Sequence, residues 1–136
     1  MKKKIFILTL LVVLCVACLP AFAMDSSESR SASPAKWNYA ADVITGINFS
    51  GTTATCSVVV SGYSSVTAID ATVTFECVTD NNLVATWPGL HSNTKNLYFS
   101  NTAPVTKGKT YRLTVYARLW SGSQYEDIIV PFQKKY

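Results

Sequence analysis

Apolar residues recur at every second position over two long stretches of the chain. Their apolar sets are Ile69, Ala71, Val73, Phe75 and Cys77 in the first stretch and Tyr111, Leu113, Val115, Ala117 and Leu119 in the second. Successive side chains of a strand point to opposite faces, so this spacing predicts strands that bury one face. No stretch keeps a 3.6-residue period, so we expect no amphipathic helix.

The same pattern predicts about seven strands, separated by turn residues. The expected strands are residues 43–49, 53–60, 68–77, 83–87, 96–100, 110–120 and 125–132. The expected turns are Asp80-Asn81-Asn82, Lys107-Gly108-Lys109 and Ser121-Gly122-Ser123, and Pro88-Gly89 is expected to stop the fourth strand. Short strands with one buried face are typical of an antiparallel β-sandwich, and 136 residues suffice for one domain.

The first residues of the chain have the features of a secretory signal peptide. Lys2-Lys3-Lys4 precedes the apolar segment 5–17, and Ala21-Phe22-Ala23 has the small-x-small pattern of a cleavage site. We therefore expect cleavage after Ala23 and a secreted, extracellular protein. Val16-Ala17-Cys18 matches half of a lipobox, so a lipoprotein modified at Cys18 is the alternative.

The remaining chain divides into two parts. Residues 24–36 are rich in Ser and polar, contain Pro34, and predict a flexible leader. Residues 37–136 are rich in Val, Ile, Thr and aromatic residues and predict the β-sandwich domain. No second long apolar run follows Ala23, so we expect no stable membrane insertion of the mature chain.

Removal of the signal peptide changes the charge balance. The whole chain has 12 Lys+Arg and 8 Asp+Glu, and the loss of Lys2, Lys3 and Lys4 leaves nine basic against eight acidic residues, a net charge of +1. Such a domain offers no electrostatic attraction for nucleic acid or an anionic membrane. The same value argues against a secreted toxin or bacteriocin-like effector, which we keep as an alternative function.

Two of the four cysteines, Cys15 and Cys18, lie in the signal peptide. The mature chain keeps Cys56 and Cys77, both expected on inward positions of consecutive strands. An even pair in an exported protein favours a disulfide, and two free thiols are the alternative.

Few residues could support catalysis or metal binding. His91 is the only histidine and is expected in an exposed loop, and no Gly-x-Ser-x-Gly motif is present. Cys56, Cys77 and His91 lack the short spacing of zinc ligands. Adjacent Glu126 and Asp127 would point to opposite faces of a strand. We predict no enzyme activity, no catalytic residues, no metal and no cofactor.

The outward positions of residues 110–120 form the most unusual surface. The candidate binding face consists of Arg112, Tyr116, Arg118 and Trp120, with Tyr125 across the turn. Exposed aromatic and Arg side chains are common in protein interfaces, and planar rings also stack on sugars. The sequence thus favours a secreted, non-catalytic module that binds an unknown protein partner, either in the extracellular space or at the cell envelope. Carbohydrate binding through the aromatic rings is the alternative, and so is a structural role in which these rings only cover the sheet.

Residues 107–117, KGKTYRLTVYA, resemble the sixth strand of fibronectin type III domains. The resemblance implies an immunoglobulin/fibronectin-III-like sandwich in which the Tyr111 hydroxyl bonds to nearby backbone. The chain is also similar to a group of small secreted Gram-positive bacterial proteins of unknown function. That similarity rests on Thr53-Ala54-Thr55-Cys56, on Lys107 to Arg112 and on the terminal Tyr136.

The fibronectin-like topology implies that the third expected strand pairs antiparallel with the sixth. This pairing would place Asp70 near Arg118 and Glu76 near Arg112 on the outward face. The two charge pairs therefore test the topology.

Overall fold

A computed structural model of the chain describes residues 29–32 and 37–136, which form strands and turns. The strands are β1 (Ser29–Ala32), β2 (Ala40–Ser50), β3 (Thr53–Gly62), β4 (Ala68–Cys77), β5 (Asn82–Ser92), β6 (Asn96–Pro104), β7 (Thr110–Ser121) and β8 (Gln124–Lys135). The described residues include no helix long and apolar enough to cross a membrane. The expected signal peptide and both cleavage positions, after Ala23 and at Cys18, lie outside the described residues.

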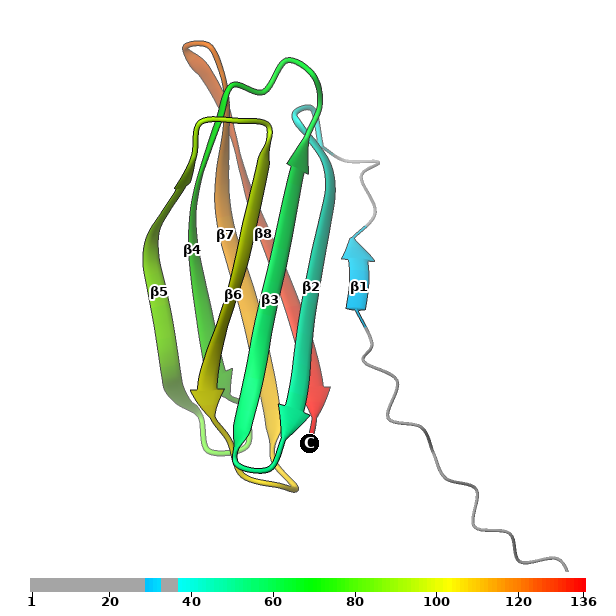
Figure 1. Cartoon of the computed structure of the whole chain (residues 1–136), viewed down its shortest axis with the longest axis vertical. Helices are drawn as coiled ribbons and strands as arrows, with labels where there is room; N and C mark the ends of the chain where they lie inside the picture. The colour runs from blue at the N-terminus through cyan, green and yellow to red at the C-terminus, as the bar shows by residue number, and fades with distance from the viewer. Residues whose placement is uncertain (1–28, 33–36) are drawn as a thin grey trace, which may run out of the picture.

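The strands form two antiparallel sheets that lie face to face as two layers (Figure 1). One sheet has the order β1-β2-β3-β6 and is called here the β3 sheet. The other has the order β5-β4-β7-β8 and is called the β7 sheet. The predicted all-β antiparallel sandwich is confirmed, and each of the seven expected strands lies within one of β2 to β8.

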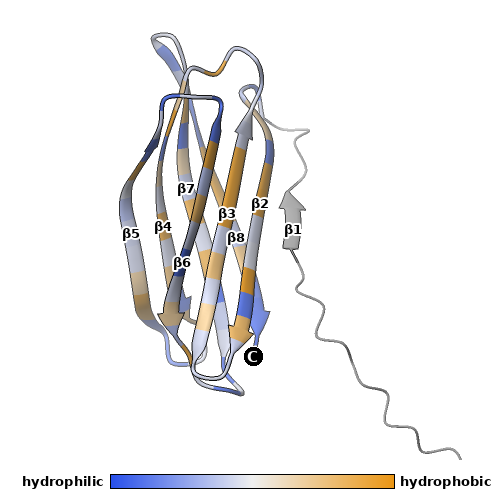
Figure 2. Cartoon of the chain, viewed as in Figure 1, coloured by the Kyte–Doolittle hydropathy of each residue, from blue (hydrophilic) through white to orange (hydrophobic). Residues whose placement is uncertain are grey.

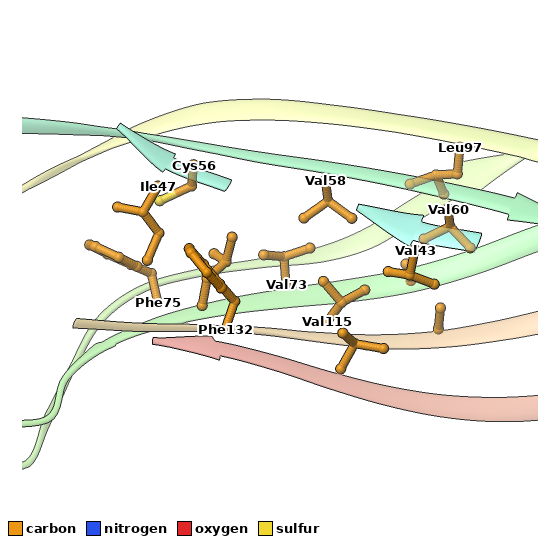
Figure 3. Packing of buried hydrophobic residues seen from close by; sticks show 14 of the residues in the cluster. Val43, Ile47, Cys56, Val58, Val60, Val73, Phe75, Leu97, Val115 and Phe132 are labelled. Carbon is orange, nitrogen blue, oxygen red and sulfur yellow. The ribbon is translucent and has the colours of Figure 1, made fainter. Parts of the chain in front are cut away.

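The core lies between the two sheets and consists of buried apolar side chains. Apolar and polar residues alternate along the strands, as Figure 2 shows. Every residue predicted to face inward on β3, β4 and β7 is buried. Figure 3 shows side chains from both sheets meeting in this layer, among them Val58 of β3, Val73 of β4 and Val115 of β7. Burial of one face of each sheet therefore accounts for the two-residue period.

The prediction that Pro88-Gly89 stops a strand is wrong. Strand β5 continues through these residues to Ser92, and its register against β4 shifts between Ala71 and Val73. Gly89 has a φ of 68°, which a glycine adopts without a steric penalty. The bulge lets the strand continue past Pro88, so His91 lies on a strand rather than in the expected loop.

Part of the predicted leader is a strand. Residues Ser29–Ala32 form β1 and pair antiparallel with β2, with Ser29 opposite Gly46 and Ala32 opposite Val43. The polar composition of this segment predicted no strand, because the pairing requires only backbone groups. Residues 24–28 and 33–36 of the predicted leader lie outside the described residues.

Candidate binding face

The outward face of the β7 sheet, called here the β7 face, is built from cross-strand rows of side chains. Strand β4 pairs with β7 in the predicted register, with Asp70 opposite Arg118 and Glu76 opposite Arg112. The register of β8 extends these rows, since Asp127 lies opposite Arg118 and Ile129 opposite Tyr116. The topological prediction that the third and sixth strands share a sheet is confirmed.

His91 of β5 lies opposite Asp70 and binds it. The Nδ1 of His91 is 2.6 Å from Oδ1 of Asp70, and its Nε2 is 2.7 Å from Oδ1 of Asn93. Both partner atoms are oxygens that accept, so these contacts favour the protonated ring, which can donate from both nitrogens. The hydrogen bond to Asp70, followed by that to Asn93, raises the pKa of His91 above its ordinary 6.5.

Asp70 is also held from the other side. Its Oδ2 accepts a hydrogen bond from Nε1 of Trp120 at 2.7 Å. The hydrogen bonds from His91 and then from Trp120 lower the pKa of Asp70 below its ordinary 3.8. Asp70 therefore remains a carboxylate that fixes the orientation of Trp120.

Arg118 binds Asp127 rather than the predicted Asp70. Its Nε and Nη2 donate to the two carboxylate oxygens of Asp127 at 2.7 and 2.8 Å. The register places Asp70 and Arg118 opposite each other. Arg118 nevertheless bonds to Asp127 on β8, because that carboxylate accepts a bidentate hydrogen bond and Asp70 already accepts from His91 and Trp120. The second predicted pair is present, since Nη1 of Arg112 donates to Oε1 of Glu76 at 2.9 Å.

Arg118 also covers two of the predicted aromatic residues. Its guanidinium lies 4.0 Å from the ring centroid of Tyr125 and 5.6 Å from that of Trp120. The two rings are tilted by 57° to each other. Because the rings are not coplanar and Arg118 stacks on them, Trp120 and Tyr125 do not form a flat platform for a sugar.

Tyr116 stands between two hollows of the β7 face. The first has a volume of about 630 Å³ and is lined by Asp70, Thr72, Arg118, Trp120, Ile129 and neighbouring residues. The second, of about 600 Å³, is lined by Glu76, Arg112, Thr114, Pro131, Phe132 and Gln133. Tyr116 lines both hollows and is 45% exposed, and its cross-strand neighbour Ile129 is 64% exposed. An aromatic side chain of β7 and an aliphatic side chain of the edge strand β8 are thus adjacent and accessible.

The structure brings the five predicted face residues onto one sheet but divides their roles. Arg112, Arg118, Trp120 and Tyr125 are bonded to or stacked on neighbouring side chains, whereas Tyr116 remains open between the hollows. The sequence analysis missed His91 and Ile129. The outward period of residues 125–132 was the signal for Ile129, while His91 required the pairing of β4 with β5.

A second exposed aromatic lies on the opposite sheet. Tyr98 of β6 is 74% exposed, and the register places Val59 beside it and Ile44 beyond. This apolar row crosses the outward face of the β3 sheet and was not predicted. The neighbouring outward positions hold mainly Ser, Thr and Asn.

The predicted disulfide is not formed. Cys56 and Cys77 are both free and buried, on β3 and at the end of β4 in the facing sheet. Figure 3 shows Cys56 beside Ile47 and near Phe75, which lies two residues before Cys77 on β4. The two cysteines therefore lie on strands of different sheets with no bridge between them. Burial raises the pKa of the Cys56 thiol to about 12, so this thiol is uncharged.

Reactive groups are few in the described part of the chain. No group of three or more His, Cys, Asp or Glu residues there could hold a metal ion. Both ring nitrogens of His91 are engaged by Asp70 and Asn93, so neither is available to take a proton from a nucleophile. Tyr111 makes the backbone contact that the fibronectin resemblance implied, since its hydroxyl accepts the Thr106 N–H at 2.8 Å.

No protein-family model, curated protein or solved structure matches the chain.

Proposed function

We propose that this protein is a secreted, non-catalytic module that binds another protein through the β7 face. The observation that carries the proposal is the position of Tyr116 and Ile129. Tyr116 is exposed on the inner strand β7 with a hollow on each side, and Ile129 is exposed beside it on the edge strand β8. Exposed aromatic side chains at the centre of a face are the usual hot spots of protein interfaces.

The charges on the β7 face support an apolar contact rather than ionic recognition. Its ion pairs are His91–Asp70, Arg118–Asp127 and Arg112–Glu76. Each charge in these three pairs is neutralised within the face, so a partner gains little from a charge of its own beside them. The partner should therefore offer apolar side chains to the two hollows.

Carbohydrate binding remains the alternative, favoured by Trp120 and Tyr125. These rings would have to release Arg118 before a sugar could stack on them, because the guanidinium lies 4.0 Å from the Tyr125 centroid. A glycan ligand would therefore depend on Tyr125, whereas a protein ligand would depend on Tyr116.

The two functions can be separated with three variants of the mature domain. Immobilised wild-type, Tyr116→Ala, Tyr125→Ala and Tyr98→Ala proteins are offered extracellular proteins in one experiment and a glycan array in another. We expect a protein ligand whose affinity falls about tenfold or more with Tyr116→Ala. Tyr98→Ala is the matched control, because Tyr98 is exposed on the opposite sheet. A glycan ligand lost with Tyr125→Ala would contradict the proposal.

A further inference from the structure

The unpaired edges of the two sheets differ in how they are protected. A sheet edge exposes N–H and C=O groups to which another strand can add, and proteins block such edges with charges, prolines, bulges or a covering segment. The edge strands are β1 and β6 in the β3 sheet and β5 and β8 in the β7 sheet. Because β1 covers only four residues of β2, β2 is itself the edge over the rest of its length. Three of these strands carry their own protection.

Strands β5 and β8 are protected by their sequences. Strand β5 contains Pro88 and has two register irregularities against β4. Strand β8 contains Pro131 and four charged residues, which are Glu126, Asp127, Lys134 and Lys135. Neither strand offers a flat, uncharged edge to another chain.

Strand β6 is blocked by short side chains that bond to its backbone. The Asn96 carbonyl accepts hydrogen bonds from Ser92 Oγ and Thr94 Oγ1, at 2.7 and 3.0 Å. The Thr102 N–H donates to Oδ1 of Asn101 at 2.8 Å. Pro104 has no N–H to offer. Asn96, Thr102 and Pro104 are separated by even numbers of residues, so their backbone groups all point to the same side of β6, which is the open edge.

Strand β2 has no charge, proline or bulge of its own over residues 43–50, VITGINFS, since Asp42 and its register shift against β3 lie at the start of the strand. The segment has no charged residue and no proline, and its β-branched and aromatic content favours strand pairing. The two-residue turn 51–52 makes Ser50 and Thr53 the hydrogen-bonded pair that closes the hairpin of β2 and β3. Backbone groups alternate in direction along a strand, so those of Ile47, Thr45 and Val43 point away from β3. Lys134 of β8 donates to the Ile47 carbonyl at 3.2 Å, and β1 lies opposite the other two.

We propose that the edge of β2 is a self-association site for a second copy of this chain, and that β1 masks it. Strand β1 covers only four residues of β2, from Val43 to Gly46, and Figure 1 shows it as a short separate strand beside β2. When β1 leaves, two copies join their sheets through antiparallel pairing of one β2 with the other.

A second copy fits this edge better than an unrelated strand. Antiparallel pairing of β2 with itself is two-fold symmetric and brings no like charges together within residues 43–50. The apolar row Ile44, Val59 and Tyr98 crosses the β3 sheet and reaches the same edge, where Ile44 is 37% exposed. The joined sheets would therefore bring two such rows together.

The test uses proline substitutions in β1 of the chain without its expected signal peptide. Arg30 lies opposite Thr45 and Ala32 opposite Val43, so their N–H groups point toward β2. Arg30→Pro or Ala32→Pro removes one of these donors, whereas Ser31→Pro is the matched control because the Ser31 N–H points away. We expect the first two variants to sediment as dimers at concentrations where the parent and Ser31→Pro are monomers.

A second substitution locates the contact. Adding Ile44→Lys to Arg30→Pro places a charge on the opened edge and should restore the monomer. Thermal unfolding measured on each variant shows whether it is folded. The proposal is wrong if folded Arg30→Pro and Ala32→Pro remain monomeric at every concentration. It is also wrong if Ile44→Lys leaves the dimer intact.

Discussion

At the scale of single residues, the β7 face satisfies its own charges. Each of its ion pairs is about half exposed, so solvent screens it and its contribution to stability is small. Their main effect is on register, because a slip by one residue would turn these charges into the core. The apolar side chains that remain accessible between these pairs are Tyr116 of β7 and Ile129 of β8.

The His91–Asp70 contact should make stability depend on pH. The folded-state pKa of His91 is raised, so its contribution is fully present below pH 6.5 and is lost as pH rises through the folded value. The folded-state pKa of Asp70 is lowered, so its contribution persists above pH 3.8. We expect His91→Gln to lower the melting temperature more at pH 5.5 than at pH 9.

The measurement is thermal unfolding of both proteins across this pH range. His91 is the only histidine, so a transition above pH 6.5 in the wild type should disappear in the variant. An equal loss of melting temperature at both pH values would show that the imidazolium charge makes no contribution.

At the scale of elements, the turns and bulges decide where side chains are presented. Strand β5 continues past Pro88-Gly89 because a bulge shifts its register against β4. The shifted register places His91 opposite Asp70. The segment between β6 and β7 is held by Tyr111, whose ring stacks on Phe75 and whose hydroxyl accepts the Thr106 N–H. A core residue thus anchors a connection outside the sheets.

Tyr111→Phe should lower the free energy of unfolding by about 1–2 kcal/mol, because it leaves the Thr106 N–H without its acceptor. Tyr116→Phe, on the same strand but exposed, is the matched control and should change stability by less than about 0.5 kcal/mol. Urea unfolding monitored by fluorescence compares the two. Equal effects would mean that the Tyr111 hydroxyl has no structural role.

At the scale of the whole molecule, packing rather than a disulfide joins the two sheets. The chain's last residue, Tyr136, follows β8 and stacks on Phe49 of β2 with ring centroids 4.5 Å apart. Its hydroxyl donates to the Gly51 carbonyl at 2.9 Å, in the turn between β2 and β3. The terminal residue therefore ties the β7 sheet to the β3 sheet at one end of the sandwich.

Tyr136→Ala should lower the free energy of unfolding by about 2 kcal/mol, through loss of the stacked ring and the hydrogen bond. Tyr136→Phe keeps the ring and should lose about 1 kcal/mol or less. Chemical denaturation of both variants gives these values. A Tyr136→Ala variant as stable as the wild type would show that the two sheets do not depend on this contact.

The amino-acid sequence was enough to predict the all-β class, seven of the strands and the buried faces of β3, β4 and β7. These follow from a period of two, which is a local property of each segment. That Asp70 lies opposite Arg118 was implied by the fibronectin resemblance and not by the period. The bonding partner of each side chain and the continuation of β5 past its proline were set by tertiary contacts.

Those outcomes depend on strands that are distant in sequence and compete for the same groups. Arg118 of β7 bonds to Asp127 rather than to Asp70, because β8 pairs with β7 on the side opposite β4. Cys56 and Cys77 stay free on strands of the two facing sheets, and no local pattern sets how those strands are placed relative to each other. Strand β1 pairs with β2 through backbone N–H and C=O groups. Every residue except proline carries both groups, so the composition of residues 29–32 did not reveal this strand.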